Sequence, residues 1–341
     1  MKKITLLIFL GLIFISSLPL WSKVGTSSGQ FLKIGIGARA AGLGDAYCAL
    51  SDGVETIYWN PAGLADMNRS ELSLMYNSWL ETINYNFIAF AYPYFSYGTL
   101  AVAINYLSMS PITKCDNTGD SSGWGTISPY DLAINFGYGY FFSPKNKIGI
   151  NLKFINSCLE EDSVTAFAVD LGYQRELTKY FTLGVALQNL GTGLRYREET
   201  ASLPVNFKFG LAYNRTILTN FSLLPTTFVL DFNLPVDNDL SINSGIEYRY
   251  RIIQKMFVAF RFGIKTSHIF STESYADFGY THYLGTEYWG AFSFGLGINN
   301  ENFSLDYAFV PFYDLGSSHR LSLRLKFGKV TSKFLPKGLF R

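Results

Sequence analysis

The chain has 341 residues, of which 48% are hydrophobic, 17% are aromatic and only 16% are charged. Because soluble domains usually carry about 25% charged residues, this composition is unusual for a soluble protein. The 31 glycines, 23 tyrosines and 30 phenylalanines also differ from a helical membrane protein, which is built mainly from Leu, Ile, Val and Ala. A formal net charge of +2 argues against a nucleic-acid-binding protein, which would show a basic stripe, and against an acidic disordered chain.

Residues 1–22 have the pattern of a secretory signal peptide. A basic start, Lys2-Lys3, precedes an apolar run over residues 4–15, and the small residues Ser16, Ser17 and Ser22 lie near its end. The run is shorter than the roughly 20 apolar residues that a membrane-spanning helix needs. We therefore expect cleavage after Ser22 and export of the mature chain, in which no further long apolar run predicts a transmembrane helix.

Residues 23–70 form an N-terminal segment that is rich in glycine and alanine. Asp52, followed three residues later by Glu55, predicts the start of a short helix with a capping box. Asn60-Pro61 should end that helix, because a residue before proline is pushed out of the helical region. Small side chains let a backbone approach its neighbours closely, so the segment is suited to packing inside a narrow space.

The same segment contains a glycine pattern similar to a dinucleotide-binding fingerprint. Gly35-x-Gly37-x-x-Ala40 follows an apolar stretch, and Glu55 lies 20 residues after Gly35. A true fingerprint would be followed by alternating helices and parallel strands. Since the rest of the chain has a different pattern, we do not expect a nucleotide cofactor.

From residue 71 the hydrophobic pattern has a period of two, which predicts β-strands. In residues 130–140, for example, large apolar side chains alternate with Asp, Ala, Asn and Gly. Two architectures have this pattern: a soluble sandwich with its apolar faces inside, and an outer-membrane barrel with its apolar face toward lipid. Strands of about 9–13 residues, aromatic side chains at the strand ends, and polar faces rich in glycine and alanine favour the barrel.

The pattern predicts an all-β transmembrane barrel of about fourteen antiparallel strands over residues 71–328, followed by a tail at 329–341. Connections after even-numbered strands are short, whereas those after odd-numbered strands include the long ones at 109–128, 191–202 and 268–287. Short periplasmic turns and long outer loops are the rule for such barrels. The predicted strands span residues 71–78, 84–94, 97–108, 129–141, 146–158, 163–175, 180–190, 203–215, 221–234, 240–250, 256–267, 288–299, 302–311 and 318–328.

Several charged residues fall on the polar faces of these strands and should face the lumen. An enclosed charge needs a partner, so pairing with the N-terminal segment or with other lumen residues is the expected role. A selectivity lining is the alternative. The predicted lumen-facing charges are Asp131, Asp170, Asp231, Glu247, Arg249, Arg261, Asp306 and Arg324.

Neither a catalytic site nor a metal site is predicted. The histidines, His268, His282 and His319, lack the spacing of metal ligands. An odd number of cysteines gives no disulfide framework, and either a Cys115–Cys158 bridge or three free thiols, with Cys48, is compatible with the sequence. We therefore expect a protein that is not an enzyme and has no cofactor.

Several separated motifs occur in the order found in one known family. They include residues 31–42, Asp45-Ala46-Tyr47, residues 58–64, Gln188-Asn189-Leu190-Gly191 and Leu305-Asp306-Tyr307. Together they resemble the PorV/PorQ family of outer-membrane barrels, which is related to the FadL long-chain fatty-acid transporters. The resemblance implies an N-terminal, partly helical hatch in the lumen. By the same resemblance, the residues expected in the hatch or near a ligand are Asn60, Pro61, Ala62, Gly63, Arg39 and Asp45.

Three functions follow as hypotheses. The resemblance implies a scaffold of type IX-like secretion, whose partners would be secreted cargo or secretion machinery. The hatch implies, as the alternative, FadL-like transport of hydrophobic compounds such as fatty acids across the outer membrane. A soluble periplasmic β-protein is the third hypothesis, and it requires the apolar strand faces to meet one another. The first two place the protein in contact with outer-membrane lipid.

Overall fold

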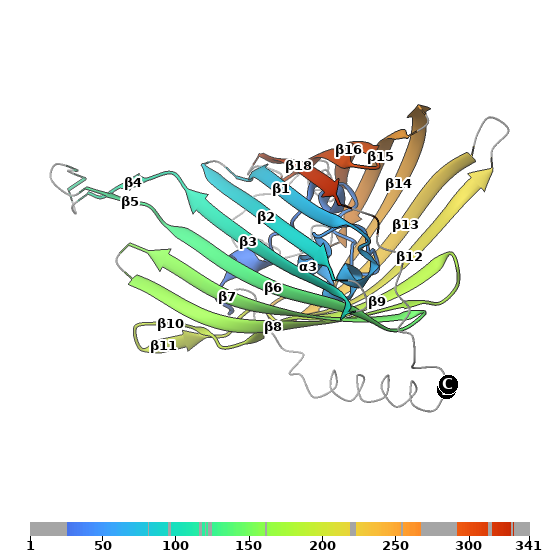
Figure 1. The fold of residues 1–341 in the computed structure, drawn as a ribbon. Coiled ribbons are helices and arrows are strands. Elements are labelled where there is room, and N and C mark those ends of the chain that lie inside the picture. Colours follow the sequence, from blue (N-terminus) through green and yellow to red (C-terminus); the bar gives the residue numbers. More distant parts are fainter. Residues whose placement is uncertain are drawn as a thin grey trace.

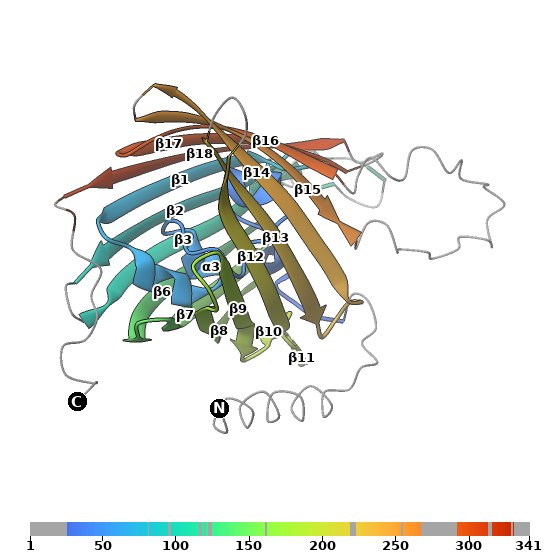
Figure 2. The same cartoon turned by 90° about the vertical axis from the view of Figure 1, so that its right-hand side faces the viewer.

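The computed structural model describes residues 26–330, apart from residues 81, 95–96, 116–117, 120, 122–124, 161, 219–222, 254, 267–291, 313–315 and 329. Within these residues the chain forms one closed antiparallel barrel of fourteen strands around an N-terminal segment (Figures 1 and 2). The predicted signal peptide, His268 and His282, and residues 331–341 of the predicted tail lie outside the described residues.

The barrel strands follow one another around the wall in chain order. Strand β1 also pairs with β18, from Ser70 opposite Phe327 to Ser78 opposite His319, and this pairing closes the ring. The barrel strands are β1 (Ser70–Ser78), β2 (Ile83–Pro93), β3 (Thr99–Met109), β6 (Tyr130–Ser143), β7 (Asn146–Leu159), β8 (Asp162–Glu176), β9 (Phe181–Gly191), β12 (Asn206–Leu218), β13 (Leu223–Pro235), β14 (Ser241–Ile253), β15 (Met256–Lys265), β16 (Phe292–Asn300), β17 (Phe303–Pro311) and β18 (Ser317–Phe327).

The structure confirms the predicted fold class. Because the ring is closed, the strands leave no unpaired sheet edge, which is the condition for a β-structure in lipid. The connections are short at one end, such as residues 144–145 and 301–302, and include long ones at the other, at 110–129 and 192–205. We call these the short-turn end and the long-loop end. Two small hairpins in the long connections were not predicted: β4 (Ile112–Thr113) with β5 (Thr126–Ile127), and β10 (Leu194–Tyr196) with β11 (Glu199–Ala201).

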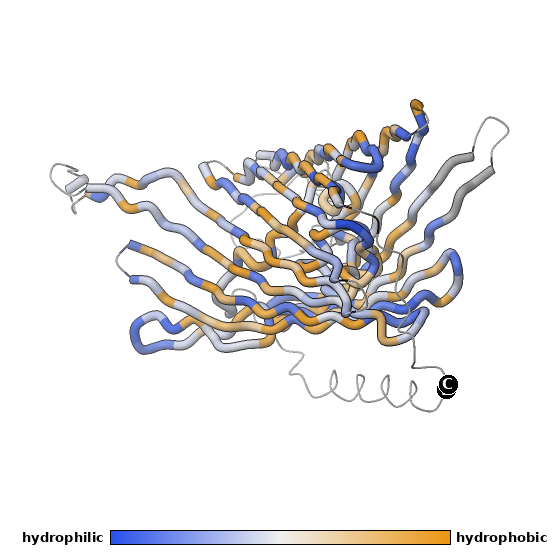
Figure 3. Tube along the Cα trace, viewed as in Figure 1, coloured by the Kyte–Doolittle hydropathy of each residue, from blue (hydrophilic) through white to orange (hydrophobic). Residues whose placement is uncertain are grey.

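Side-chain burial alternates along the strands in the way that the period of two predicted. On β3, Ala101 and Ala103 are buried toward the lumen, whereas Leu100, Val102 and Ile104 are exposed on the outer wall. Apolar and polar residues alternate along most strands in Figure 3. The large apolar side chains therefore cover the outside of a closed ring. The soluble sandwich required these side chains to pack against one another, and they do not.

The N-terminal segment fills the lumen as a chain of short helices. These are η1 (Gln30–Lys33), α2 (Ala38–Gly42), α3 (Thr56–Trp59) and η2 (Pro61–Asp66), of which α2 and α3 are α-helices and the others are 3-10 helices. Residues 31–50 and 53–64 are buried apart from Lys33, and α3 lies inside the barrel in both views (Figures 1 and 2). We call residues 27–66 the plug segment.

One detail of the plug segment corrects the sequence interpretation. Helix α3 ends at Trp59, before Asn60-Pro61, as predicted. The predicted capping box is wrong, because Glu55 itself is the N-cap residue, with no side-chain capping hydrogen bond. The carboxylate of Asp52 instead pairs with cations, described below.

Two further findings concern the described residues. No helix among them is long and apolar enough to span a membrane. Cys48, Cys115 and Cys158 are all free thiols, so the possible Cys115–Cys158 bridge is not formed.

Candidate functional site

Inward-facing glycines let the backbone of the plug segment lie directly against the backbone of the barrel wall. A Cβ atom on Gly149 would overlap the carbonyl carbon of Pro61, and one on Gly263 would overlap the backbone nitrogen of Gly44. Any larger side chain at these positions would therefore displace the plug segment. Similar contacts to the plug segment come from Gly137, Gly139, Gly172, Gly184, Gly210, Gly245 and Gly295 on other strands.

The turn at residues 60–62 attaches the plug segment to the wall. Asn60 is fully buried, and its Oδ1 caps η2 by accepting a hydrogen bond from the backbone N–H of Ala62 at 3.2 Å. Its Nδ2 donates to the backbone oxygen of Cys48 at 2.8 Å, and to those of Tyr173 and Val185 in the wall at 3.2 Å each. This amide therefore bridges two parts of the plug segment and two strands. The other predicted hatch residues of this turn, Pro61, Ala62 and Gly63, are also buried.

A network of buried charges joins α2 to strands β14, β15 and β17. Arg39 forms two hydrogen bonds to Glu247, from Nε to Oε2 at 2.8 Å and from Nη2 to Oε1 at 3.0 Å. Glu247 also pairs with Arg249 at 2.8 Å and with Arg261 at 2.6 Å, and Arg261 continues to Asp306 at 2.8 Å. Because a buried charge without a partner is strongly destabilising, each member of this network depends on the others.

Asp52 extends this network to a cluster of cations. Its carboxylate lies 2.5 Å from Arg39 Nη1, 3.7 Å from Arg249, 3.8 Å from Arg324 and 3.7 Å from Lys326. Its side chain is 40% exposed, unlike the neighbouring Glu247, which is fully buried. Lys326 lies next to the end of β18, so this contact between plug segment and wall is close to the short-turn end.

Other charged contacts hold the middle of the plug segment. Asp45 pairs with Lys265 and, at 3.7 Å, with Arg320, which also donates a hydrogen bond to the backbone oxygen of Gly35 at 2.9 Å. Asp231 of β13 accepts hydrogen bonds from the backbone N–H groups of residues 47 and 48, each at 2.8 Å. The wall thus supplies both cations and carboxylates to the plug segment.

The protonation of plug-segment carboxyls follows from burial and neighbouring charge. Burial acts to raise the pKa of Asp52, but attraction to Arg39 and the other three cations outweighs it, so the pKa is lowered. Burial and attraction to Lys265 compete at Asp45 in the same way, and its pKa is also lowered. At Glu55 the effect of burial exceeds the attraction to Arg324, and the pKa is raised. One Glu55 oxygen accepts a hydrogen bond from Ser73 at 3.0 Å, and the other has no partner among the described residues.

A large cluster of buried apolar side chains joins the plug segment to the barrel wall. Phe31, Leu32 and Tyr58 belong to one packed cluster with Tyr85 and Phe87 of β2, and all five are buried. The Tyr58 hydroxyl donates a hydrogen bond to the backbone oxygen of Leu32 at 2.8 Å, so its ring contributes apolar surface. A hydrophobic molecule would meet few unpaired polar groups here.

The predicted lumen-facing charges all lie at inward-facing positions of their strands. Six are buried: Asp170, Asp231, Glu247, Arg261, Asp306 and Arg324. Arg249 is 35% exposed, and Asp131 is half-buried opposite Ser157 of β7. Asp170 pairs with Lys153, not with the plug segment, at 2.8 Å.

Sequence reasoning missed several residues that hold the plug segment. Gln174 donates hydrogen bonds to the backbone oxygens of Cys48 and Leu50, both at 3.0 Å, and Gln188 donates to that of Tyr58 at 2.6 Å. Both glutamines lie on the polar faces of predicted strands, and that position was the available signal. Because an amide carries no charge, the charge pattern of the sequence did not indicate these two residues.

The described residues contain no group of three His, Cys, Asp or Glu side chains that could hold a metal ion. His319 lies on the outer wall, where its ring nitrogens are 2.8 Å from the Tyr307 hydroxyl and 3.1 Å from the Ser317 hydroxyl.

One protein-family model matches more than half of the chain. The model of the uncharacterised protein family UPF0164 matches residues 22–262, which include the whole plug segment and ten complete barrel strands. The chain belongs to UPF0164. No curated protein matches this UPF0164 member.

Solved structures resemble this UPF0164 chain over nearly their whole length. The toluene transporter TbuX of Ralstonia pickettii is 13% identical with a TM-score of 0.53, and covers 86% of this chain and 99% of its own. The toluene transporter TodX of Pseudomonas putida has 10% identity, a TM-score of 0.53 and the same coverage. The monoaromatic hydrocarbon channel CymD has 13% identity and a TM-score of 0.53 over 86% of this chain and 98% of its own.

At these identities the likeness establishes a shared fold. The chain has the barrel fold of these transporter and channel structures. Membership of PorV/PorQ and a role in type IX secretion stay predictions, because these matches do not bear on them.

Proposed function

We propose that this chain is an outer-membrane channel for small hydrophobic molecules, with aromatic hydrocarbons among them, and that the plug segment closes its lumen. The observation that carries the proposal is a closed fourteen-stranded barrel filled by its own N-terminal segment, in a fold shared with TbuX, TodX and CymD. The chemistry of passage is non-covalent, so neither a catalytic residue nor a cofactor is required.

The outer wall supports a membrane location. Large apolar side chains are exposed on most strands, including Phe136 at 57% and Phe167 at 62%. Burying apolar surface is worth about 25 cal/mol per Å², so a wall of this kind would be unfavourable in water. Aromatic pairs lie at the short-turn end, such as Tyr94 with Tyr97 and Tyr180 with Tyr213, where an interfacial girdle is expected.

The interior supports a hydrophobic solute over a polar one. Phe31, Leu32 and Tyr58 of the plug segment belong to the same large apolar cluster as Tyr85 and Phe87 of β2, and this cluster gives the plug segment an apolar surface. Ion pairs and hydrogen bonds hold the plug segment at other points, including Asp45, Asp52 and Asn60. A small shift of the plug segment along this apolar surface would break fewer polar contacts than a shift elsewhere, so we place the route of the solute beside it.

Uptake of toluene by cells tests the proposal. Cells that express the chain should take up radiolabelled toluene faster than cells with an empty vector, and their uptake of sucrose should be unchanged. Equal toluene uptake with and without the chain, despite its presence in the outer-membrane fraction, would overturn the proposal, as would equal acceleration of toluene and sucrose.

A matched pair of substitutions locates the route. Phe31→Gln adds a polar group to the apolar cluster and should slow toluene uptake several-fold. Ile112→Gln makes a similar change on the exposed β4 hairpin, where Ile112 is 46% exposed, and should leave uptake unchanged. Heat-dependent electrophoretic mobility, a property of folded barrels, checks that both variants fold.

A further inference from the structure

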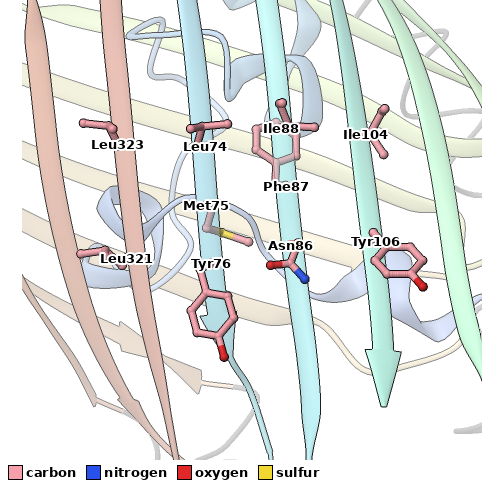
Figure 4. Close-up of a pocket in the computed structure, with 10 residues that line it drawn as sticks. All are labelled: Leu74, Met75, Tyr76, Asn86, Phe87, Ile88, Ile104, Tyr106, Leu321 and Leu323. Atoms are coloured by element: carbon pink, nitrogen blue, oxygen red, sulfur yellow. The ribbon is translucent and has the colours of Figure 1, made fainter. Parts of the chain in front are cut away.

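A hollow of about 370 Å³ opens on the outer wall, where strands β18, β1, β2 and β3 lie side by side (Figure 4). Two rows of outward-facing side chains line it. Strand register places Leu323, Leu74, Ile88 and Ile104 in one row, and Leu321, Tyr76, Asn86 and Tyr106 in the next. Its volume lies within the usual range for a small-molecule site, which is about 300–1,000 Å³.

Asn86 creates the hollow. It stands between Tyr76 and Tyr106 in its row, and the short amide leaves the space that a third large side chain would fill (Figure 4). The Tyr76 hydroxyl donates a hydrogen bond to Asn84, at 2.8 Å, and not to Asn86. No hydrogen bond from the described residues reaches the Asn86 amide, so its donors and acceptor are available to a bound molecule.

The depth of Asn86 along the barrel wall determines which part of a membrane lipid it would contact. Toward the short-turn end, the outward side chains of β2 are Ile88, Phe90 and then Tyr92, which is an apolar band that ends in an aromatic residue. Toward the long-loop end, the next row is polar: His319, Ser78, Asn84 and Ser108. Tyrosines and tryptophans mark the boundary between hydrocarbon and headgroups, so the Asn86 row lies at that boundary.

We infer that the hollow is a binding site for one acylated membrane lipid. The acyl chain would lie along the row of Leu74, Ile88 and Leu323, inside the apolar band. The Asn86 amide would donate a hydrogen bond to the ester carbonyl that joins this chain to the glycerol, since esters lie at the depth of the aromatic girdle. A polar group in lipid without a partner is unfavourable, and the lipid ester supplies the partner.

The site lies on the outer face of the wall and the proposed transport route lies on its lumen side, with Phe87 bordering both. Met75 and Phe87 also line the hollow, but both are buried on the lumen side of the wall, where Met75 accepts a contact from the backbone N–H of Gly37 at 3.0 Å. The inference depends on the membrane location given under the proposed function, and it does not depend on transport. Toluene uptake and lipid binding can therefore fail independently.

Native mass spectrometry of the full chain in mild detergent tests the inference. The protein is titrated with 1-palmitoyl-2-oleoyl-phosphatidylethanolamine and, separately, with a dialkyl ether analogue that lacks ester carbonyls. The wild type should retain one diacyl lipid about tenfold more tightly than the ether lipid, which is the effect expected of one hydrogen bond. Equal retention of the two lipids would overturn the role of Asn86 as a donor to the ester.

Two substitutions and a control separate shape from hydrogen bonding. Asn86→Leu keeps an apolar hollow and should lose only the preference for the ester lipid. Asn86→Trp fills the hollow and should lower retention of both lipids at least tenfold. Leu296→Trp, on the outer wall of β16 where Leu296 is 51% exposed, should change neither. Unchanged retention by Asn86→Trp, in a variant with normal heat-dependent mobility, would overturn the site itself.

Discussion

Glu247 shows what a single residue contributes to this barrel. It is fully buried and faces three guanidinium groups, those of Arg39, Arg249 and Arg261. Arg39 belongs to the plug segment and the other two to the wall, so the carboxylate joins both parts. Its removal would leave more buried positive charge than negative charge in one place, and desolvated charge has no water to compensate it.

We expect Glu247→Gln to lower the free energy of unfolding by about 3–5 kcal/mol, the range for breaking a buried ion pair. Glu301→Gln is the matched control, because Glu301 pairs with Lys255 at the surface, where the two side chains are 59% and 67% exposed. That change should cost less than about 1 kcal/mol. Urea unfolding of both variants in lipid vesicles measures the difference, and equal losses of stability would contradict this account.

The elements of the plug segment depend on the wall for their structure. Helices α2 and α3 have five and four residues, far fewer than the roughly 12–15 that an isolated helix needs in water. Close backbone contacts at wall glycines and capping by Asn60 replace the missing intrinsic stability. Conversely, each barrel strand pairs with two others, so the wall does not need the plug segment to complete its hydrogen bonds.

We therefore expect Gly149→Val to dislodge the plug segment and leave the barrel folded. A valine side chain would occupy the space of the Pro61 carbonyl carbon, and the C-terminal half of the plug segment would have to move. Single-channel conductance in planar bilayers should rise, with heat-dependent mobility unchanged. Ile150→Val, which alters the exposed outer face of the same strand, is the control and should keep the low conductance of the wild type.

On the scale of the whole molecule, retention of the plug segment depends on pH through groups that act in opposite directions. The lowered pKa of Asp52 means that its contribution is present above the ordinary carboxyl pKa, near 3.9, and is lost as pH falls through the lowered value. The raised pKa of Glu55 means that its contribution is greatest at low pH and falls as pH rises through the raised value. Near neutral pH, Asp52 stabilises the closed state and Glu55 opposes it.

Conductance of the reconstituted protein across pH measures both effects. The wild type should stay closed between about pH 5 and 8, and closure should weaken progressively only as pH falls below the ordinary carboxyl pKa, near 3.9, toward the lowered pKa of Asp52. Asp52→Asn should already conduct at pH 7. Glu55→Gln should be at least as tightly closed as the wild type at pH 7–8. Tight closure of Asp52→Asn at pH 7 would rule out Asp52 as a link between the plug segment and the wall.

Much of the wall could be predicted because its pattern is local. The observed strand Asn146–Leu159 differs by one residue from the predicted range 146–158, since alternation, turns and strand length all depend on neighbouring residues. The inward orientation of Glu247 and Asp231 followed from the same alternation. The partners of these groups could not be predicted, because Arg39 and Glu247 are 208 residues apart in the chain.

The sequence by itself determined the number of strands, the apolar outer face and the break before Asn60-Pro61, because each is a property of consecutive residues. Only the tertiary structure decided how the interior is arranged. The glycines that admit the plug segment, the cations around Asp52 and the gap left by Asn86 between two tyrosines arise when distant strands come into register. Closure of the ring sets that register, and no short stretch of sequence contains it.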